Sequence, residues 1–288
     1  MSRSFLDDMA EASLERVRAA RRARSEAALE REARQTPPPP PLRLDPSRFD
    51  LIAEFKLRSP AAGRLGAAAE SVAARATEYA RAGAAAVSVL TEPSRFDGSL
   101  EHLASAAGAL APLRVPAMRK DFLVDPYQVL EARAAGAGGV LVIVRMLSRA
   151  ALDALLDSAR SLGLFVLLEA FDARDLELVR ELVGSHTGSN LLLAGVNCRD
   201  LGTLEVSPGR LLELAALLPP SVPCVAESGV TTEADAREIG AAGYELALVG
   251  SALMRGAAPH SLARTLLAAG RAGRAGRSAR ERTAREAT

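Results

Sequence analysis

Lysine is almost absent from this chain. Of its 36 basic residues 34 are arginines, and the only two lysines are Lys56 and Lys120. Arginine supplies positive charge equally well on a surface, but only the compact lysine ammonium can give up its proton when its surroundings lower its pKa. Both lysines follow short apolar runs and stand near carboxylates in the sequence. We therefore expect them at strand ends in a functional site rather than as surface charges.

Other scarce features exclude several classes of protein. Aromatic residues make up 3% of the chain and tryptophan is missing, so Ala, Leu and Val must build the core. The two cysteines, Cys198 and Cys224, form neither a disulfide framework nor a metal-binding spacing, which predicts a reduced, cytoplasmic compartment. A net charge of +1 gives no support for a nucleic-acid partner. No uncharged apolar run approaches the length of about 18 residues that a membrane span needs, and the charged start contains no signal peptide.

Composition divides the chain into three parts. Pro37 to Pro41 predict a stiff, extended connector. We expect a helical extension with this connector over residues 1–41, an α/β domain over 42–268, and an Arg-rich tail over 269–288 that is disordered or a frayed helix end. Residues 5–34 predict a single amphipathic helix. Its apolar stripe consists of Phe5, Leu6, Met9, Leu14 and Val17.

Eight short β-like runs alternate with Ala- and Leu-rich helical segments. Several of these segments end in Gly before the next run, which is a helix stop signal. The runs are apolar on both faces, as is typical of a parallel sheet covered by helices. The pattern predicts an α/β fold, a closed (β/α)8 TIM barrel with an N-terminal helical extension. A doubly wound open sheet is the alternative, although its glycine-rich dinucleotide motif is missing after the first run. The runs span residues 51–55, 86–90, 115–119, 139–144, 164–168, 191–196, 222–226 and 244–249.

Polar residues follow most of these runs. Barrel enzymes carry their sites at the C-terminal ends of the strands, so these side chains are predicted to converge. One polar strand end means little, whereas polar ends on this many strands indicate a site. In chain order they are Glu54, Lys56, Ser59, Lys120, Asp121, Glu169, Asn197, Arg199, Glu227, Ser228, Gly229, Gly250 and Ser251.

The last two pairs, Ser228-Gly229 and Gly250-Ser251, predict a phosphate site. Barrels often bind phosphate with the loops after strands 7 and 8 and the start of a short helix. Glycine lets backbone N–H groups approach an anion, and serine adds a hydroxyl donor. Each pair alone is also an ordinary helix N-cap, so it is their occurrence on adjacent strands that favours phosphate.

Several segments resemble the indole-3-glycerol phosphate synthase family over residues 50–256. The Arg-Lys-Asp-Phe and Asn-x-Arg-Asp-Leu blocks are the most specific, and all the blocks occur in the family's order. The matching segments are Ile52 to Pro60, Leu90 to Ser99, Arg119 to Gln128, Leu168-Glu169, Gly195 to Leu201, Ala226 to Gly229 and Val249 to Ser251.

The resemblance implies a carbon–carbon lyase (a carboxy-lyase) of tryptophan biosynthesis. Its reaction converts 1-(2-carboxyphenylamino)-1-deoxyribulose 5-phosphate into indole-3-glycerol phosphate, CO2 and water. The resemblance implies no metal or organic cofactor, a small phosphorylated substrate as the partner, and a monomer or weak homo-oligomer. The catalytic residues that it implies are Glu54, Lys56, Lys120, Glu169, Asn197 and Glu227.

Within that set, Lys120 resembles the acid that protonates the developing alkoxide. We expect desolvation and nearby cations to lower its pKa, so that it donates readily. Glu169 and Lys56 are the candidates for the later dehydration, in roles that the sequence does not divide. Arg199 either binds the substrate carboxylate or pairs structurally with Asp200 or Glu205.

Further residues are expected to bind substrate. The aromatic ring of the substrate needs an apolar slot. The candidate residues for this slot could equally belong to the hydrophobic core. The family often supplies an aromatic residue from a helix over the barrel mouth; only Phe5 could do so here, and residues 5–34 would form that lid. Arg145 either faces the site or lies in the rim. The remaining substrate-binding candidates are Ser59, Phe96, Phe122, Leu141, Leu201 and Leu248.

Three other functions fit a phosphate-binding barrel less well. An Amadori isomerase would need an acid/base pair such as Cys and Asp, but the first strand offers Glu54 and Lys56. A Schiff-base enzyme could use Lys120. A barrel that binds a phosphorylated ligand without turnover would be favoured by loss of a catalytic lysine or glutamate, and none is lost.

Overall fold

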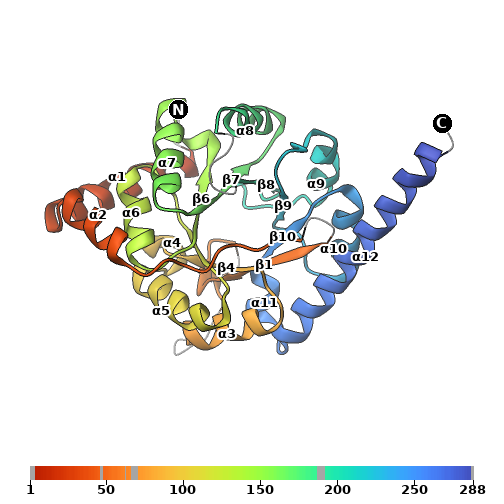
Figure 1. The fold of residues 1–288 in the computed structure, drawn as a ribbon, viewed down its shortest axis with the longest axis horizontal. Coiled ribbons are helices and arrows are strands. Elements are labelled where there is room, and N and C mark those ends of the chain that lie inside the picture. The colour runs from red at the N-terminus through yellow and green to blue at the C-terminus, as the bar shows by residue number, and fades with distance from the viewer. Residues whose placement is uncertain (1–3, 46–47, 62, 66–70, 187–191, 287–288) are drawn as a thin grey trace.

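The computed structural model describes residues 4–45, 48–61, 63–65, 71–186 and 192–286. Eight parallel strands close into a barrel, and helices surround it (Figure 1). This confirms the predicted (β/α)8 barrel; residue 191, the expected start of the sixth strand, lies outside the described residues. The barrel strands are β1 (Asp50–Phe55), β4 (Ala86–Leu90), β5 (Ala117–Lys120), β6 (Gly139–Ile143), β7 (Phe165–Ala170), β8 (Leu192–Asn197), β9 (Cys224–Glu227) and β10 (Leu246–Val249).

The connections are mostly helical, with serine, threonine or acidic N-caps on most of the longer helices. A small antiparallel hairpin, β2 (Arg58–Ser59) with β3 (Gly63–Arg64), follows β1. No helix in the described part of the chain is long and apolar enough to cross a membrane. The helices after β1 are α3 (Val72–Arg81), α4 (Pro93–Phe96), α5 (Leu100–Leu110), α6 (Pro126–Ala134), α7 (Arg149–Ser161), α8 (Ala173–Ser185), α9 (Gly209–Leu214), α10 (Glu233–Ala242), α11 (Ser251–Arg255) and α12 (Pro259–Glu286), with 3-10 turns η1 (Ala111–Leu113), η2 (Val144–Met146) and η3 (Ala215–Leu217).

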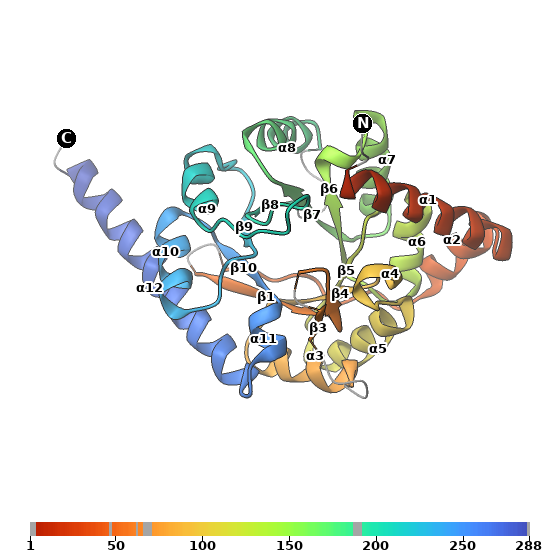
Figure 2. The same ribbon diagram turned by 180° about the vertical axis from the view of Figure 1, so that it is seen from behind.

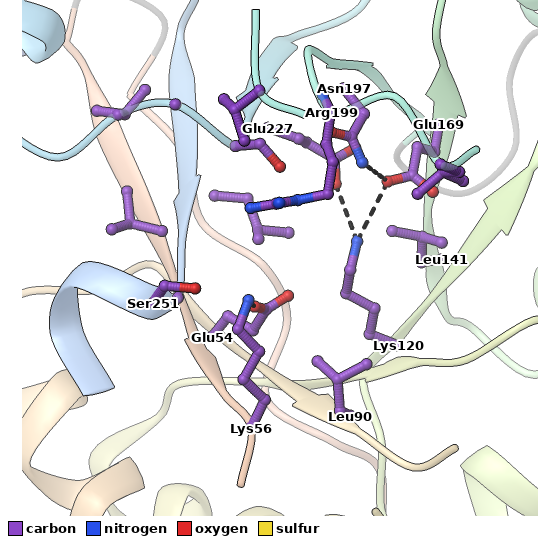
Figure 3. A pocket seen from close by; sticks show the side chains of 18 of the residues that line it. Glu54, Lys56, Leu90, Lys120, Leu141, Glu169, Asn197, Arg199, Glu227 and Ser251 are labelled. Carbon is purple, nitrogen blue, oxygen red and sulfur yellow. Dashed lines mark hydrogen bonds and ion pairs between the residues drawn. The ribbon is translucent and has the colours of Figure 1, made fainter. Parts of the chain in front are cut away.

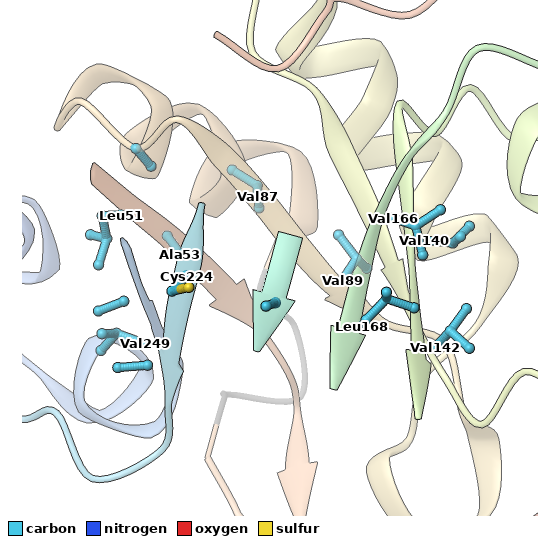
Figure 4. Close-up of a cluster of buried hydrophobic side chains, with 14 of the residues drawn as sticks. Leu51, Ala53, Val87, Val89, Val140, Val142, Val166, Leu168, Cys224 and Val249 are labelled. Atoms are coloured by element: carbon cyan, nitrogen blue, oxygen red, sulfur yellow. The ribbon is translucent and has the colours of Figure 1, made fainter. Parts of the chain in front are cut away.

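Side chains alternate between two buried layers along each strand, because successive residues of a strand point to opposite faces. Leu51 and Ala53 belong to the outer layer between barrel and helices, which Figure 4 shows in part. Ile52 belongs to the layer inside the barrel. The apolar residues on both faces of the strands are therefore explained, since both faces are buried. The same alternation places Glu54 inside the barrel at the end of β1.

The N-terminal segment forms two helices, α1 (Phe5–Ala23) and α2 (Glu26–Gln35), where one was expected. The first helix ends at Ala23 with Arg24 as its C-cap. Ser25 caps the second, because its side chain accepts a hydrogen bond from the backbone N–H of Ala28. Met9 of α1 joins the apolar layer inside the barrel, so α1 packs beside the barrel mouth (Figure 2). Leu14, expected in the apolar stripe, is exposed.

The C-terminal helix α12 continues into the tail to Glu286, so the described part of the tail is helical (Figure 1). Glycines allow it to lie close against α10: a side chain at Gly240 would meet the backbone of Gly270, and one at Gly273 would meet the carbonyl of Arg237. Arg274 donates to the carbonyl oxygens that follow α10. These contacts hold residues 270–274 of the Arg-rich stretch against α10.

Candidate active site

A cavity of about 370 Å³ lies at the C-terminal ends of the barrel strands, within the usual range for small-molecule sites. Every site residue predicted from the sequence lines this cavity, with the exception of Ser59. Ser59 is buried in the β2–β3 hairpin, so it is not brought together with the others. The predicted strand-end residues therefore converge on one cavity, apart from Ser59, which lies three positions beyond Lys56.

Lys120 stands in the centre of the cavity among carboxylates. Its Nζ lies 3.0 Å from Oε2 of Glu227 and 3.3 Å from Oε1 of Glu169 (Figure 3). The same Glu169 oxygen accepts a hydrogen bond of 2.8 Å from Nδ2 of Asn197. Residues at the ends of β5, β7, β8 and β9 are therefore joined in one network.

The pKa of Lys120 is raised, and the expectation of a lowered pKa is wrong. Burial disfavours the ammonium, but Glu169, Glu227 and Glu54 outweigh it. The sequence could not show this, because these carboxylates come from distant strands. Lys120 is consequently a fully protonated donor at neutral pH.

Glu54 and Lys56 form a second pair beside the first. They make a close ion pair, and Glu54 is almost fully buried. Burial alone would raise the pKa of the Glu54 carboxyl, but Lys56 and Lys120 lower it below its usual value. Gly250 leaves room for the pair, since a side chain there would overlap the Glu54 carboxylate. Gly250 was predicted to contact phosphate, and its contact with Glu54 is a second reason for glycine at this position.

Glu227 depends on a glycine that the sequence analysis did not single out. Its Oε1 is buried without a hydrogen-bond partner in the described residues and lies where a side chain at Gly195 would project. Burial and the neighbouring Glu169 raise the pKa of Glu227 well above its usual value, against the opposing effect of Lys120. Gly195 belongs to a quoted block, but only strand register shows that it faces the barrel interior.

Glu227→Gln should change how stability depends on pH. The raised pKa in the folded state means that folding favours the protonated carboxyl. The stability that the wild type gains in this way is complete below the ordinary carboxyl pKa of 4.5. It is lost as pH rises through the pKa of the folded state. We therefore expect the variant to gain stability relative to wild type between about pH 5 and about pH 8. Urea unfolding at both pH values measures the difference.

Glu233 is exposed, so Glu233→Gln, the same chemical change on the surface, is the control for that experiment. A constant difference between Glu227→Gln and wild type across the pH range would contradict the assigned shift.

Aromatic residues build one wall of the cavity. Phe122 packs at 6.2 Å from Phe96 between ring centroids, and both line the cavity with Leu141 and Leu201. Phe5 of α1 contacts Phe122 edge to face at 5.9 Å but does not itself line the cavity. Helix α1 therefore supports this wall from behind, in place of supplying a ring to it.

Two arginines that the sequence left open are now placed. Arg199 lines the cavity (Figure 3) and donates to the carbonyl oxygen of Leu204 at 2.8 Å. Among the described ion pairs none joins it to Asp200 or Glu205. Arg145 lies in the rim instead, where it bonds Asp175 at 2.7 Å and stacks over Phe171.

The two predicted phosphate loops share the opposite end of the cavity. Ser251 lies across from Leu141 in Figure 3. Ser228 and Gly229 both have left-handed backbone, with φ of 66° and 73°. A non-glycine residue in this region costs roughly 1–3 kcal/mol and such strain concentrates at functional sites.

A buried polar network behind Lys120 was missed. Arg119 donates to Thr91, Asp121, Glu131 and the carbonyl oxygen of Gln128 at 2.8–3.2 Å. Its neighbours in the quoted Arg-Lys-Asp block were interpreted as site residues, and Arg119 was not. Because side chains alternate along β5, Lys120 faces the cavity and Arg119 anchors the strand from outside.

A comparison with protein families shows the family of this chain. A family model described as indole-3-glycerol phosphate synthase matches residues 6–266. The chain belongs to this family. A curated indole-3-glycerol phosphate synthase from Parafrankia sp. (strain EAN1pec) is 44% identical over 77% of this chain and 79% of its own length. One from Micrococcus luteus is 44% identical over 79% of this chain and 81% of its own.

A fungal relative and solved structures extend the comparison. The multifunctional tryptophan biosynthesis protein of Schizosaccharomyces pombe is 40% identical over 78% of this chain, which corresponds to 29% of that protein. Thiamine phosphate pyrophosphorylase from Pyrococcus furiosus has a TM-score of 0.55 at 15% identity, covering 79% of this chain and 98% of its own. Tryptophan synthase from M. tuberculosis has a TM-score of 0.51 at 17% identity, covering 79% and 92%. At such identities the solved structures show the barrel fold alone.

No group of three or more His, Cys, Asp or Glu side chains in the described residues is arranged to hold a metal ion. The charged residues that line the cavity are Glu54, Lys56, Lys120, Asp121, Glu169, Arg199 and Glu227.

Proposed function

We propose that this chain is a carboxy-lyase of tryptophan biosynthesis that converts 1-(2-carboxyphenylamino)-1-deoxyribulose 5-phosphate into indole-3-glycerol phosphate. The observation that carries the proposal is Lys120, held by Glu169 and Glu227 between an apolar wall and two Gly-Ser loops. Such a cavity fits a substrate with an aromatic ring at one end and a phosphate at the other. Family membership supports the same reaction.

Ring closure comes first. The aromatic carbon that bears the carboxylate attacks the ribulose carbonyl carbon, and the electrons of the C=O bond move onto its oxygen. Lys120 donates its proton to this oxygen as charge develops. A raised pKa does not prevent the transfer, because an alkoxide is more basic than an amine. The three surrounding glutamates keep Lys120 protonated before each turnover.

Decarboxylation and dehydration follow. The bond to the carboxylate breaks, CO2 leaves, and its electron pair restores the aromatic ring. The new hydroxyl then leaves as water with a proton from an acid, while a base removes a proton from the adjacent CH2 group. Lys56 and Glu169 are the proposed acid and base in this step. Lys56 is ion-paired to Glu54 and Glu169 to Lys120, so each is held in a fixed position.

The remaining groups are proposed to orient the substrate. Arg199 provides a cation in the cavity for the substrate carboxylate. Asn197, which is bonded to Glu169, is placed to contact the ribulose hydroxyls or the amine. Leu248 and the aromatic wall fill the apolar side, which excludes water from the reacting atoms.

The phosphate end is tested by Ser251→Asp. A carboxylate at this position would repel a bound phosphate, so we expect KM to rise at least about tenfold, equal to ~1.4 kcal/mol, with kcat changed little. Steady-state kinetics measures both constants, and Ser251→Ala, which removes the hydroxyl without adding charge, is the control. An unchanged KM in Ser251→Asp would place the phosphate elsewhere.

We also propose that the chain acts in the cytoplasm as a monomer or weak homo-oligomer, without a nucleic-acid partner. The two free, buried cysteines support the reduced compartment, and the net charge of +1 supports the absence of a nucleic-acid partner.

The proposed reaction is tested by incubating the purified chain with the carboxyphenylamino-deoxyribulose phosphate in EDTA. Indole fluorescence should develop with turnover, and chelation should not lower the rate, because the proposed acid and base are side chains. Absence of turnover, or activity that requires added metal, would refute the proposal.

A further inference from the structure

Arg16 of α1 lies between two carboxylates that belong to different barrel loops. Its Nη2 is 2.8 Å from Oδ1 of Asp121, after β5, and its Nη1 is 3.7 Å from Oε1 of Glu92, after β4. Both carboxylates are buried, whereas the Arg16 side chain is 29% exposed. Arg16 is not among the residues that line the cavity, so any effect on the reaction must pass through its partners.

Glu92 holds the loop that carries Phe96. Its carboxylate accepts hydrogen bonds from the backbone N–H groups of Ser94 and Arg95, at 2.8 and 2.7 Å, and so caps α4. Its carbonyl oxygen accepts from the N–H of Gly98 at 2.9 Å. Helix α4 ends at Phe96, so the carboxylate of Glu92 fixes the position of that ring.

Asp121 holds the loop that carries Phe122. Its Oδ1 accepts from the backbone N–H of Phe122 at 2.8 Å, and its Oδ2 accepts from Thr91 at 2.7 Å. At its carbonyl group, Phe122 accepts a second hydrogen bond, of 2.5 Å, from the hydroxyl of Ser13 in α1. Phe122 is therefore bonded to α1 directly through Ser13 and indirectly through Arg16.

We infer that Arg16 is a positioning residue that sets the separation of Phe96 and Phe122, and with it the width of the apolar slot for the aromatic ring of the substrate. The inference rests on the proposed function. The physical reason is charge: one guanidinium is shared by two buried carboxylates, one in each loop. Arg119 also pairs with Asp121, at 3.2 Å, but among the described ion pairs Glu92 has its cation in Arg16. Without Arg16, the buried charge of Glu92 would be left uncompensated beside Asp121 in a poorly screened environment, and the loop of Phe96 would shift away from that of Phe122.

The test compares Arg16→Leu with Arg21→Leu. Arg21 is on the same helix and pairs with Asp125 at 2.8 Å, outside the network of Arg16. We expect Arg16→Leu to raise KM about tenfold with a smaller change in kcat. The inhibition constant of inorganic phosphate, a probe of the other end of the cavity, should not move. Arg21→Leu should leave KM unchanged.

A second substitution tests the proposed cause. Glu92→Gln in the Arg16→Leu background removes one of the two like charges while keeping an oxygen to cap α4, so it should restore part of the lost affinity. An unchanged KM in Arg16→Leu, or equal changes in KM and in the phosphate inhibition constant, would overturn the inference. Lack of turnover by the wild-type chain would instead refute the proposed function itself, so the two failures are distinguishable.

Discussion

Lys120→Ala is expected to lower kcat by about a hundredfold to ten-thousandfold, the range typical of a lost general acid. The substrate should still bind, because the apolar wall and the phosphate loops are untouched. The variant also leaves Glu169, Glu227 and Glu54 buried without their shared cation, and breaking a buried pair costs about 3–5 kcal/mol. Alanine at this position therefore tests catalysis and stability together.

Lys120→Arg separates the two effects. Arginine keeps the positive charge among the carboxylates but does not release a proton near neutral pH. We expect Lys120→Arg to retain much of the wild-type stability, whereas its kcat should fall nearly as far as that of Lys120→Ala. Thermal unfolding, a fluorescence titration with substrate, and steady-state kinetics give the three readouts. A Lys120→Arg variant with near-normal kcat would show that charge alone is needed here and that Lys120 is not the acid.

Gly195→Ala is expected to have the second largest effect. The added methyl group would overlap Oε1 of Glu227 and approach Leu167 inside the barrel. Glu227 would then have to leave the position from which it bonds Lys120 at 3.0 Å. Misplacing a catalytic group by about 1 Å can cost about a hundredfold in rate, and overpacking costs about 1–3 kcal/mol of stability. Kinetics and urea unfolding measure these losses.

Gly184→Ala is the matched control for this substitution. Gly184 is exposed in α8, and a methyl group there would meet nothing within 4 Å. The same chemical change should therefore leave kcat unaltered and stabilise the helix by up to ~1 kcal/mol. If Gly195→Ala behaved like this control, Glu227 would not depend on the space that Gly195 provides.

The sequence predicted those features that depend on local pattern. Alternating buried faces and glycine stops indicated the strands, and the strand-end rule then placed Glu54, Lys120 and Asn197 at one end of the barrel. These predictions succeeded because the alternation of faces along a strand and the alternation of strands with helices can be recognised from residues that are close together in the chain. Predicting where the cavity lies therefore required no knowledge of contacts between residues that are distant in the sequence.

The features that were missed depend on long-range contacts. The pKa of Lys120 is governed by Glu169 and Glu227, which are 49 and 107 positions away. Arg16 belongs to a helix so rich in charge that one arginine cannot be distinguished from a solvated neighbour until Asp121 is seen beside it. The tail was expected to be disordered or a frayed helix end, and the sequence could not decide between these two, because Arg274 finds its partners on the rest of the chain only in the folded state.

We propose that Lys120 supplies the proton for an indole-forming ring closure. The most direct measurement is the amount of CO2 and of indole-3-glycerol phosphate released from the carboxyphenylamino-deoxyribulose phosphate by the wild-type chain and by Lys120→Arg. We expect equal amounts of both products from the wild type, and almost none from Lys120→Arg, which should still bind the substrate. Equal product formation by the two proteins would contradict it, as would a wild-type chain that binds the substrate and releases neither product.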